Sequence, residues 1–247
     1  MNLSKYLSKD RLSTVTVLDV TDSTNTQLKK MKGAPHGSVI IANAQTAGRG
    51  RYDRTFHSPK GGIYLSYLYC GKISKLTDIT AVCGVTVRRA VKKITGVDLS
   101  VKWVNDLLLN SKKVCGILAE TVYTGDTHRT VIGIGINCGD ENSVLPDEIK
   151  DIATSIYDET GILPDRCALC AEIIKALDTI DSLDRDEIFN EYSENCITVG
   201  KNVRVFSEFY ESDGKIIAIN PNFSLEFLSE NGEKRCIYSG EVSVKPR

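Results

Sequence analysis

The most informative segment of the chain is Gln45–Thr46–Ala47–Gly48–Arg49–Gly50–Arg51–Tyr52–Asp53–Arg54. An apolar run at residues 39–42 precedes it and a second run at 63–68 follows it, and both have the residue types of strands. The segment between them is therefore predicted to be a loop. Its glycines let the backbone approach a ligand closely, and its arginines match carboxylate and phosphate oxygens. Its composition alone fits a clamp over an anionic small molecule, a solvated surface loop or a nucleic-acid-binding segment.

Composition narrows these alternatives. The chain has 247 residues, 41% of them hydrophobic and 26% charged, which is typical of a soluble globular protein. Its net charge of −1 lacks the basic excess expected of a general nucleic-acid binder. The N-terminus shows no signal-peptide pattern, and no apolar run approaches the length of a membrane span. We therefore expect a cytoplasmic protein with no membrane contact.

The eight cysteines are scattered along the chain, and we expect reduced thiols, with Cys167 and Cys170 buried. Cys167 and Cys170 have CxxC spacing, but no second pair completes a zinc site, and the segment has a helical pattern.

Periodicity predicts a mixture of strands and helices over most of the chain. A short helix is expected within 1–12, and further helices at 26–31, 78–94, 166–180 and 186–195. Asp22 or Ser23 is expected to cap the helix at 26–31. Strands are expected at 15–20, 38–44, 63–69, 114–121 and 130–137, and on both sides of a kink at Asn105–Asp106. Turns are expected at 110–113 and 125–126, and a loop with a short helix at 146–154. Short strands separated by turns follow residue 198, which predicts a small β-barrel. We expect a domain boundary between residues 1–196 and 197–247.

The strand at 130–137 carries glycines that alternate with isoleucines. The missing side chains open one face of the sheet to a flat or closely fitting group. Gly133 and Gly135 are not a dinucleotide fingerprint, because the third glycine and the following helix are absent, and no P-loop pattern occurs in the chain. A nucleotide would therefore have to bind by another route.

Five motifs in one order resemble those of the biotin protein ligase family. The family has an STN turn, a GRGRxxR loop followed by SPxGGxYxS, a KWPNDxxxxxxKxxGIL segment and a GxGINV-like strand. The corresponding residues here are Ser23–Thr24–Asn25, Gly48 to Arg54, Ser58 to Ser66, Lys102 to Leu118 and Gly133 to Asn137. The match covers Asp19 to Asn137, and residues 239–243 resemble the last strand of the family's SH3-like C-terminal domain. Two positions depart from the pattern, since Val104 stands in place of proline and Phe56 in place of tryptophan.

The resemblance implies an α+β fold, in which helices pack on the mixed sheet of a class II synthetase-like catalytic domain and a small SH3-like β-barrel follows. It also implies two reactions. The carboxylate of biotin attacks the α-phosphate of ATP to give biotinyl-5′-AMP, and a lysine of a biotin carboxyl carrier protein then takes the biotinyl group. Mg²⁺ is implied mainly through the ATP phosphates, with Asn137 as a candidate ligand.

The resemblance also assigns site residues. Catalytic roles fall on Lys113, Arg51 and Asp106. Biotin contacts fall on Ser23, Thr24, Asn25, Gln45, Arg49, Gly50, Arg51, Trp103, Lys113, Gly116 and Gly135. ATP contacts fall on Arg51, Arg54, Phe56, Asn105, Asp106, Lys113 and Asn137.

Two other functions remain open at this stage. A lipoate or octanoate ligase or transferase would share the catalytic fold, but that group usually has an RRxSGGG-type loop. A nucleic-acid-binding module disagrees with the near-neutral charge and with the few aromatics near the arginines. The first strand begins near Val15, so we expect a monofunctional enzyme without an N-terminal helix-turn-helix or DNA binding. A weak homodimer is compatible with the sequence.

Overall fold

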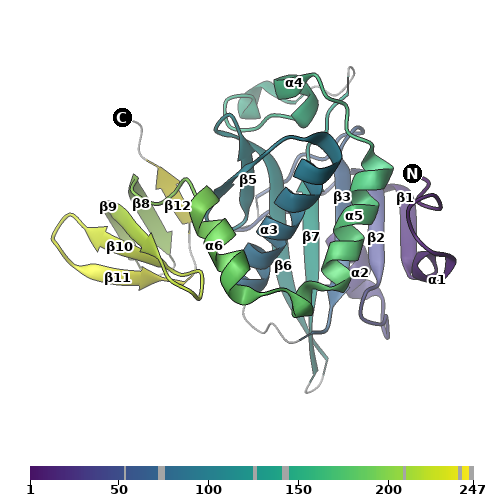
Figure 1. The fold of residues 1–247 in the computed structure, drawn as a ribbon, viewed down its shortest axis with the longest axis horizontal. Coiled ribbons are helices and arrows are strands. Elements are labelled where there is room, and N and C mark those ends of the chain that lie inside the picture. The colour runs from purple at the N-terminus through teal and green to yellow at the C-terminus, as the bar shows by residue number, and fades with distance from the viewer. Residues whose placement is uncertain are drawn as a thin grey trace.

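The computed structural model describes residues 1–52, 54–71, 76–124, 127–140, 145–207, 210–238 and 241–244. Within these residues the strands form two sheets (Figure 1). The first is a mixed, seven-stranded sheet in the order β1-β2-β3-β7-β6-β5-β4, and the second is a five-stranded sheet in the order β11-β10-β9-β8-β12. The predicted α+β class, with a mixed sheet packed by helices and a small C-terminal β unit, is confirmed.

The strands of the first sheet lie close to their predicted positions. They are β1 (Val15–Thr21), β2 (Val39–Gln45), β3 (Ile63–Tyr69), β4 (Ser100–Lys102), β5 (Asp106–Leu109), β6 (Lys112–Thr124) and β7 (Thr127–Ile136). The turn between β5 and β6 has left-handed backbone at Asn110 (φ 49°) and Ser111 (φ 69°), as a tight hairpin requires. Lys113 therefore lies within β6 rather than in the turn where the sequence placed it. The expected turn at 125–126 lies outside the described residues.

The helices are α1 (Lys9–Leu12), α2 (Thr24–Lys30), α3 (Leu76–Thr95), α4 (Ile156–Thr160), α5 (Arg166–Asp178) and α6 (Arg185–Asn195), with 3₁₀ turns η1 (Asp147–Ile149) and η2 (Ile180–Ser182). The prediction of one helix within 1–12 holds only for Lys9–Leu12. A turn that buries Leu3 and Leu7 precedes this helix, and Ser8 caps its N-terminus. Helix α2 begins two residues earlier than predicted, directly after its cap Ser23. The sequence prediction did not include α4.

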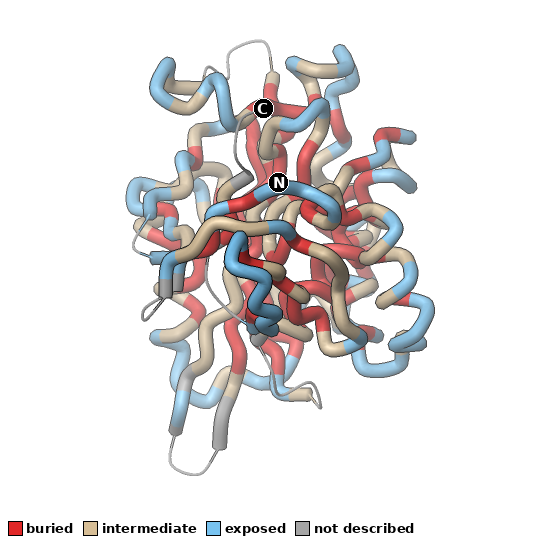
Figure 2. Tube along the Cα trace, turned by 90° about the vertical axis from the view of Figure 1, so that its left-hand side faces the viewer, coloured by how far each residue is buried: buried red, intermediate tan, exposed pale blue. Residues whose placement is uncertain are grey.

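The first sheet has different neighbours on its two faces. Helices α3 and α5 pack against one face, where side chains such as Ile41, Leu65 and Ile134 enter the main core. Helix α2 packs on the opposite face, where its Leu28 meets Ile40 and Leu68. Figure 2 shows the buried segments gathered in the interior of the molecule. Because side chains alternate along a strand, Gly133 and Gly135 of β7 face the α2 side with Val131.

The second sheet contains β8 (Asn202–Ser207), β9 (Tyr210–Ile219), β10 (Leu225–Ser229), β11 (Lys234–Ile237) and β12 (Glu241–Val244). Its buried side chains Val203 and Phe227, and Phe223 of the turn between β9 and β10, belong to the same cluster as the main core. The indole Nε1 of Trp103 also donates to the carbonyl of Phe223 at 2.7 Å. The two sheets therefore share a continuous interior, and the boundary at residues 196–197 remains a prediction. None of the described helices is long and apolar enough to cross a membrane.

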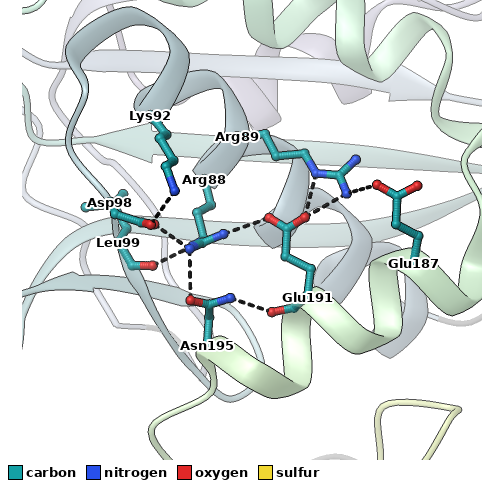
Figure 3. Close-up of polar contacts among 8 residues, drawn as sticks. All are labelled: Arg88, Arg89, Lys92, Asp98, Leu99, Glu187, Glu191 and Asn195. Carbon is teal, nitrogen blue, oxygen red and sulfur yellow. Dashed lines mark hydrogen bonds and ion pairs between the residues drawn. The ribbon is translucent and has the colours of Figure 1, made fainter.

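A polar network connects α3 to α6, the helix that leads into the second sheet (Figure 3). Arg88 of α3 is only 7% exposed. Its guanidinium donates to the carbonyl of Leu99 at 2.8 Å, to Glu191 at 2.7 Å and to Asn195 at 2.8 Å, and it pairs with Asp98. The charge of this buried arginine is thus fully compensated.

Replacing Arg88 should destabilise the fold, because the substitution leaves buried acceptors without their donor. We expect Arg88→Met to cost about 3 kcal/mol and to lower the Tm by about 6–12 °C, as measured by thermal unfolding. Lys92→Met is the control, since Lys92 also pairs with Asp98 but its side chain is 56% exposed. It should lower the Tm by no more than about 2 °C. Equal shifts in the two variants would contradict the role given to burial.

Candidate active site

A cavity of about 510 Å³ opens on the face of the first sheet that carries the glycines. Every residue that the sequence proposed for the site lines it. These residues are Ser23, Thr24, Asn25, Gln45, Arg49, Gly50, Arg51, Arg54, Phe56, Trp103, Asn105, Asp106, Lys113, Gly116, Gly135 and Asn137. Arg51 and Lys113 thus meet at one cavity although 62 residues separate them in the sequence. What each residue binds remains a prediction.

The polar end of the cavity lies at the start of α2. The backbone N–H and the hydroxyl of Thr24 both contact Oε1 of Gln45, at 2.8 and 3.1 Å. The Nε2 of Gln45 donates to the hydroxyl of Ser58 at 2.9 Å. Ser66 of β3 contacts the hydroxyl of Thr24 at 2.7 Å and Oδ1 of Asn25 at 2.5 Å. These side chains are fixed by one another before any ligand arrives, so they form a preorganised set of donors and acceptors.

The floor of the cavity is backbone. A Cβ added to Gly135 would lie 2.6 Å from the ring of Phe56, and one added to Gly116 would lie 3.0 Å from it. Phe56 also stacks edge-on against Tyr64, with ring centroids 6.4 Å apart. The sequence assigned Phe56 an ATP contact, which remains a prediction; within the protein the ring contacts the glycine floor, Tyr64 and Lys113. The close approach of this ring to the sheet is the physical reason for glycine at both positions.

The cationic end is built on the β5–β6 hairpin. The ammonium of Lys113 lies 2.6 Å from the carboxylate of Asp106 on the neighbouring strand, and 5.6 Å from the centroid of the Phe56 ring. The backbone of Lys113 is held on its other side, because its N–H donates to the carbonyl of Ile152 and its carbonyl accepts from Thr154, each at 2.9 Å. Strand position and partner charge together fix where this ammonium lies.

Arg51 approaches the same end from the loop. Its Nη1 lies 3.5 Å from Oδ1 of Asn105, and its Nη2 lies 3.0 Å from the hydroxyl of Tyr52. The amide of Asn105 is itself anchored, because its Nδ2 donates to the carbonyl of Ile117 at 3.1 Å. The loop closes as a narrow hairpin, in which Gly50 N–H donates to the Arg54 carbonyl at 2.7 Å. Arg51 is thereby presented toward the cavity.

The turn that carries Asn105 is held in place by α6 and by the segment that follows α6. Tyr192 of α6 is fully buried, and its hydroxyl donates to the carbonyl of Val104 at 3.3 Å. The backbone N–H of Trp103 donates to the hydroxyl of Thr198 at 3.2 Å. Trp103 is only 4% exposed, and its indole N–H is already bonded to Phe223. This tryptophan touches the cavity while most of its surface packs in the core.

Some residues of the site escaped the sequence analysis. The segment 151–153 lines the cavity because it pairs beside Lys113, and no local pattern reveals such a long-range contact. Glu120 lies beside the cavity and binds Asn25 Nδ2 at 2.8 Å and Lys29 Nζ at 2.6 Å. The sequence could have predicted that Glu120 lies near the site, because Gly116, Leu118 and Glu120 alternate along β6 and so share one face of the strand.

The charge state of Glu120 follows from these partners. Burial alone would raise its pKa, but the hydrogen bonds from Lys29 and Asn25 and the charges of Lys29 and Arg49 outweigh it and lower the pKa below its usual value. The carboxyl group is therefore ionised over the neutral range.

Hard oxygen ligands at the site are few. Among the described residues no group of three His, Cys, Asp or Glu side chains could hold a metal ion by itself. Asp106, Asn105 and Asn137 nevertheless present oxygen atoms from the cavity wall, and the Nδ2 of Asn137 is directed to the carbonyl of Thr154 at 3.1 Å. Such a set fits a Mg²⁺ ion whose other ligands come from phosphates and water.

Comparison with known proteins decides the family. The model of the Biotin/lipoate A/B protein ligase family matches residues 17–137. The bifunctional ligase/repressor BirA of Bacillus subtilis is 32% identical over 239 residues, which cover 92% of this chain and 72% of that protein. This chain belongs to the biotin protein ligase family. The biotin–[acetyl-CoA-carboxylase] ligase of Mycobacterium tuberculosis is 29% identical over 202 residues, covering 76% of this chain and 73% of that protein.

Solved structures of the family have the same fold. The biotin protein ligase of Aquifex aeolicus in complex with biotin and ATP superposes with a TM-score of 0.82 and 31% sequence identity. The alignment covers 94% of this chain and 99% of that one, so it includes both sheets. These relatives carry biotin ligase names, and the alternative of a lipoate enzyme is therefore not favoured.

The pKa of Glu120 predicts how stability depends on pH. An ionised Glu120 stabilises the fold above the unfolded pKa of the carboxyl group, and this contribution is lost as the pH falls through the lower, folded pKa. Urea unfolding should find Glu120→Gln less stable than the unsubstituted chain at pH 7, with a difference that shrinks below about pH 4. A difference that stays constant from pH 7 to pH 3.5 would show that the carboxylate charge does not contribute.

Proposed function

We propose that this chain activates biotin with ATP and transfers the biotinyl group to a lysine of a carrier protein. The observation that carries the proposal is the order of groups along one cavity. A fixed polar network lies at one end, a glycine floor covered by an aromatic ring lies in the middle, and Lys113 and Arg51 lie at the other end. This order matches a ligand with a polar ring system, an apolar chain and a terminal carboxylate.

The polar end suits the ureido ring of biotin, which offers two N–H donors and one carbonyl acceptor. Ser23, Thr24 and Gln45 present hydroxyl and amide groups there, and Asn25 lies beside them. The chain of biotin would then run past the Phe56 ring, which packs on Gly116 and Gly135. The carboxylate would arrive next to Lys113.

The first reaction joins two anions. An oxygen of the biotin carboxylate attacks the α-phosphorus of ATP, and the bond from phosphorus to the pyrophosphate oxygen breaks. The approach of like charges must be compensated by positive groups fixed in advance. Lys113 and Arg51 provide this charge, and Asp106 holds the Lys113 ammonium in place at 2.6 Å until phosphate oxygens compete for it.

The nucleotide would lie along the remaining wall. Arg54, Asn105 and Asn137 line this part of the cavity, together with Asp106, and the Phe56 ring lies between it and the glycine floor. We propose that Mg²⁺, bound mainly through the phosphates, supplies further charge neutralisation. Asn137 is the protein ligand that we would expect for it.

The second reaction makes an amide. The lysine amine of the acceptor attacks the carbonyl carbon of the anhydride, and AMP leaves with the electron pair. Residues 49–52 and 54–56 of the loop line the cavity, and the Phe56 N–H donates to the Gly48 carbonyl at 2.9 Å. Closure over the anhydride would protect it from water. The acceptor that we propose is a biotin carboxyl carrier domain, because the relative in Mycobacterium tuberculosis is named for acetyl-CoA carboxylase.

Removing either cation should impair the first reaction. We expect Lys113→Ala and Arg51→Ala each to slow biotin-dependent pyrophosphate release by about 10²–10³-fold, as the loss of a group that stabilises developing charge does. Lys112→Ala is the matched control, because it removes the neighbouring ammonium of the same strand, which lies outside the cavity wall. Near-normal pyrophosphate release in Lys113→Ala or Arg51→Ala, with the fold intact, would refute the assigned roles.

A further inference from the structure

Glu120 of β6 is a charged residue beside the cavity to which the reaction above gives no role. Its side chain is 19% exposed, and it does not line the cavity among the residues that the structure describes. It follows Gly116 and Leu118 on the same face of the strand, so its carboxylate ends next to the polar end of the site. Any influence on a ligand must therefore pass through other side chains.

The carboxylate contacts three groups from two parts of the chain. Its Oε2 accepts from Nδ2 of Asn25 at 2.8 Å. Its Oε1 accepts from the ammonium of Lys29 at 2.6 Å and lies 3.6 Å from Nη1 of Arg49. Asn25 and Lys29 belong to α2, whereas Arg49 belongs to the loop over the cavity. One carboxylate thus joins the sheet, the helix and the loop.

The carboxylate of Glu120 is the nearer of two acceptors that orient the Asn25 amide, since Nδ2 of Asn25 donates to it at 2.8 Å and to the carbonyl of Leu118 at 3.4 Å. An ionised carboxylate can only accept hydrogen bonds, so Nδ2 of Asn25 must face it and Oδ1 must face away. Oδ1 then contacts the hydroxyl of Ser66 at 2.5 Å. A flipped amide would direct its oxygen at the carboxylate. Gly133 leaves the space for this arrangement, since a Cβ there would lie 2.4 Å from Oδ1.

The orientation is passed on along the cavity wall. Ser66 has one hydroxyl hydrogen, and because it points to Oδ1 of Asn25, Ser66 accepts from the hydroxyl of Thr24 at 2.7 Å. The backbone N–H of Thr24 donates to Oε1 of Gln45 at 2.8 Å. The amide of Gln45 must then direct its Nε2 toward Ser58, as it does at 2.9 Å. The orientation of the Asn25 amide and of the Ser66 and Thr24 hydroxyls thus follows from Glu120, whereas the Gln45 amide is fixed by the backbone N–H of Thr24.

The Oε1 of Glu120 holds Arg49 apart from Arg51, another arginine of the loop. Arg49 is drawn toward the α2 side of the sheet by this carboxylate, whereas Arg51 lies beside Asn105 at the cationic end. Arg49 is therefore placed to anchor the loop at the polar end, and Arg51 is placed to meet the phosphates.

We propose that Glu120 is a positioning residue for biotin, which sets the hydrogen-bonding pattern of the ureido subsite through Asn25 and anchors the loop through Arg49. This inference rests on the proposed function. It assigns Glu120 to the affinity for biotin and not to the chemical step, because both of its ligand-directed contacts lie at the polar end of the cavity.

The test is the isosteric variant Glu120→Gln, which removes the charge and places an amide N–H against one of the three donors. We expect the KM for biotin, and its Kd by calorimetry, to rise by about tenfold to a hundredfold, as the loss of a charged hydrogen-bond partner predicts. The kcat at saturating biotin and ATP should change less than about threefold. Glu172→Gln is the matched control, since Glu172 binds Lys93 at 2.6 Å with a similar side-chain exposure of 22%, away from the cavity. It should leave both constants unchanged.

A double-mutant cycle tests whether Glu120 acts through Asn25. After Asn25→Ala, the further change Glu120→Gln should raise the Kd for biotin far less than it does alone, because the two residues form one chain of contacts. Ser66→Ala breaks the same chain without touching a charge, and it should also raise the Kd while kcat is preserved. Each variant is first shown to be folded by its thermal transition.

The outcomes separate this inference from the proposed function. If the unsubstituted chain forms biotinyl-adenylate but Glu120→Gln and Ser66→Ala bind biotin normally, the positioning role is wrong and the function stands. Additive effects in the double-mutant cycle, or a loss confined to kcat, would also overturn the positioning role. If the unsubstituted chain forms no biotinyl-adenylate from biotin and ATP, the proposed function itself fails.

Discussion

The site depends on one constraint, which is the absence of side chains at Gly116, Gly133 and Gly135 on the α2 face of the first sheet. β7 carries Gly133 and Gly135 toward α2, and the neighbouring β6 carries Gly116 on the same face. On the opposite face the alternate residues of β7, Ile132, Ile134 and Ile136, fill the main core. A single strand thus serves as packed interior on one side and as the floor of a cavity on the other. All the polar groups of the site are arranged around this floor.

The two ends of the cavity have different physical designs. At the polar end, neutral side chains bond to one another, with the Asn25 amide oriented by Glu120 outside the cavity and the Gln45 amide by the backbone N–H of Thr24. At the other end, the charges themselves line the wall, and Lys113 is held by Asp106. Recognition of an uncharged ring requires a fixed pattern of donors, whereas the reaction of two anions requires fixed positive charge. The fold supplies both on one rigid sheet. Tyr192 of α6 and Thr198, in the segment that follows α6, hold the turn at Asn105 in place.

The sequence predicted the parts of the site whose signal is local. The Gly and Arg residues of the loop, the Ser23–Asn25 turn and the alternating glycines all have motif spacing, and the structure brings them to one cavity. Three features depend on long-range contacts and could not be predicted. These are the pairing of residues 151–153 beside Lys113, the insertion of the Phe56 ring over the glycines and the burial of Trp103 against Phe223. The extent of the N-terminal helix was mispredicted because the burial of Leu3 and Leu7 interrupts an otherwise helical pattern.

The central claim is that one cavity joins the carboxylate of biotin to a nucleotide. It is tested most directly by incubating the chain with ATP and Mg²⁺ in the presence of equal amounts of biotin and lipoate, and by analysing the bound products by mass spectrometry. The arrangement of the cavity predicts biotinyl-5′-AMP, in an amount that approaches one per chain when pyrophosphate is removed. Formation of lipoyl-AMP, or of no acyl-adenylate by the folded chain, would contradict it.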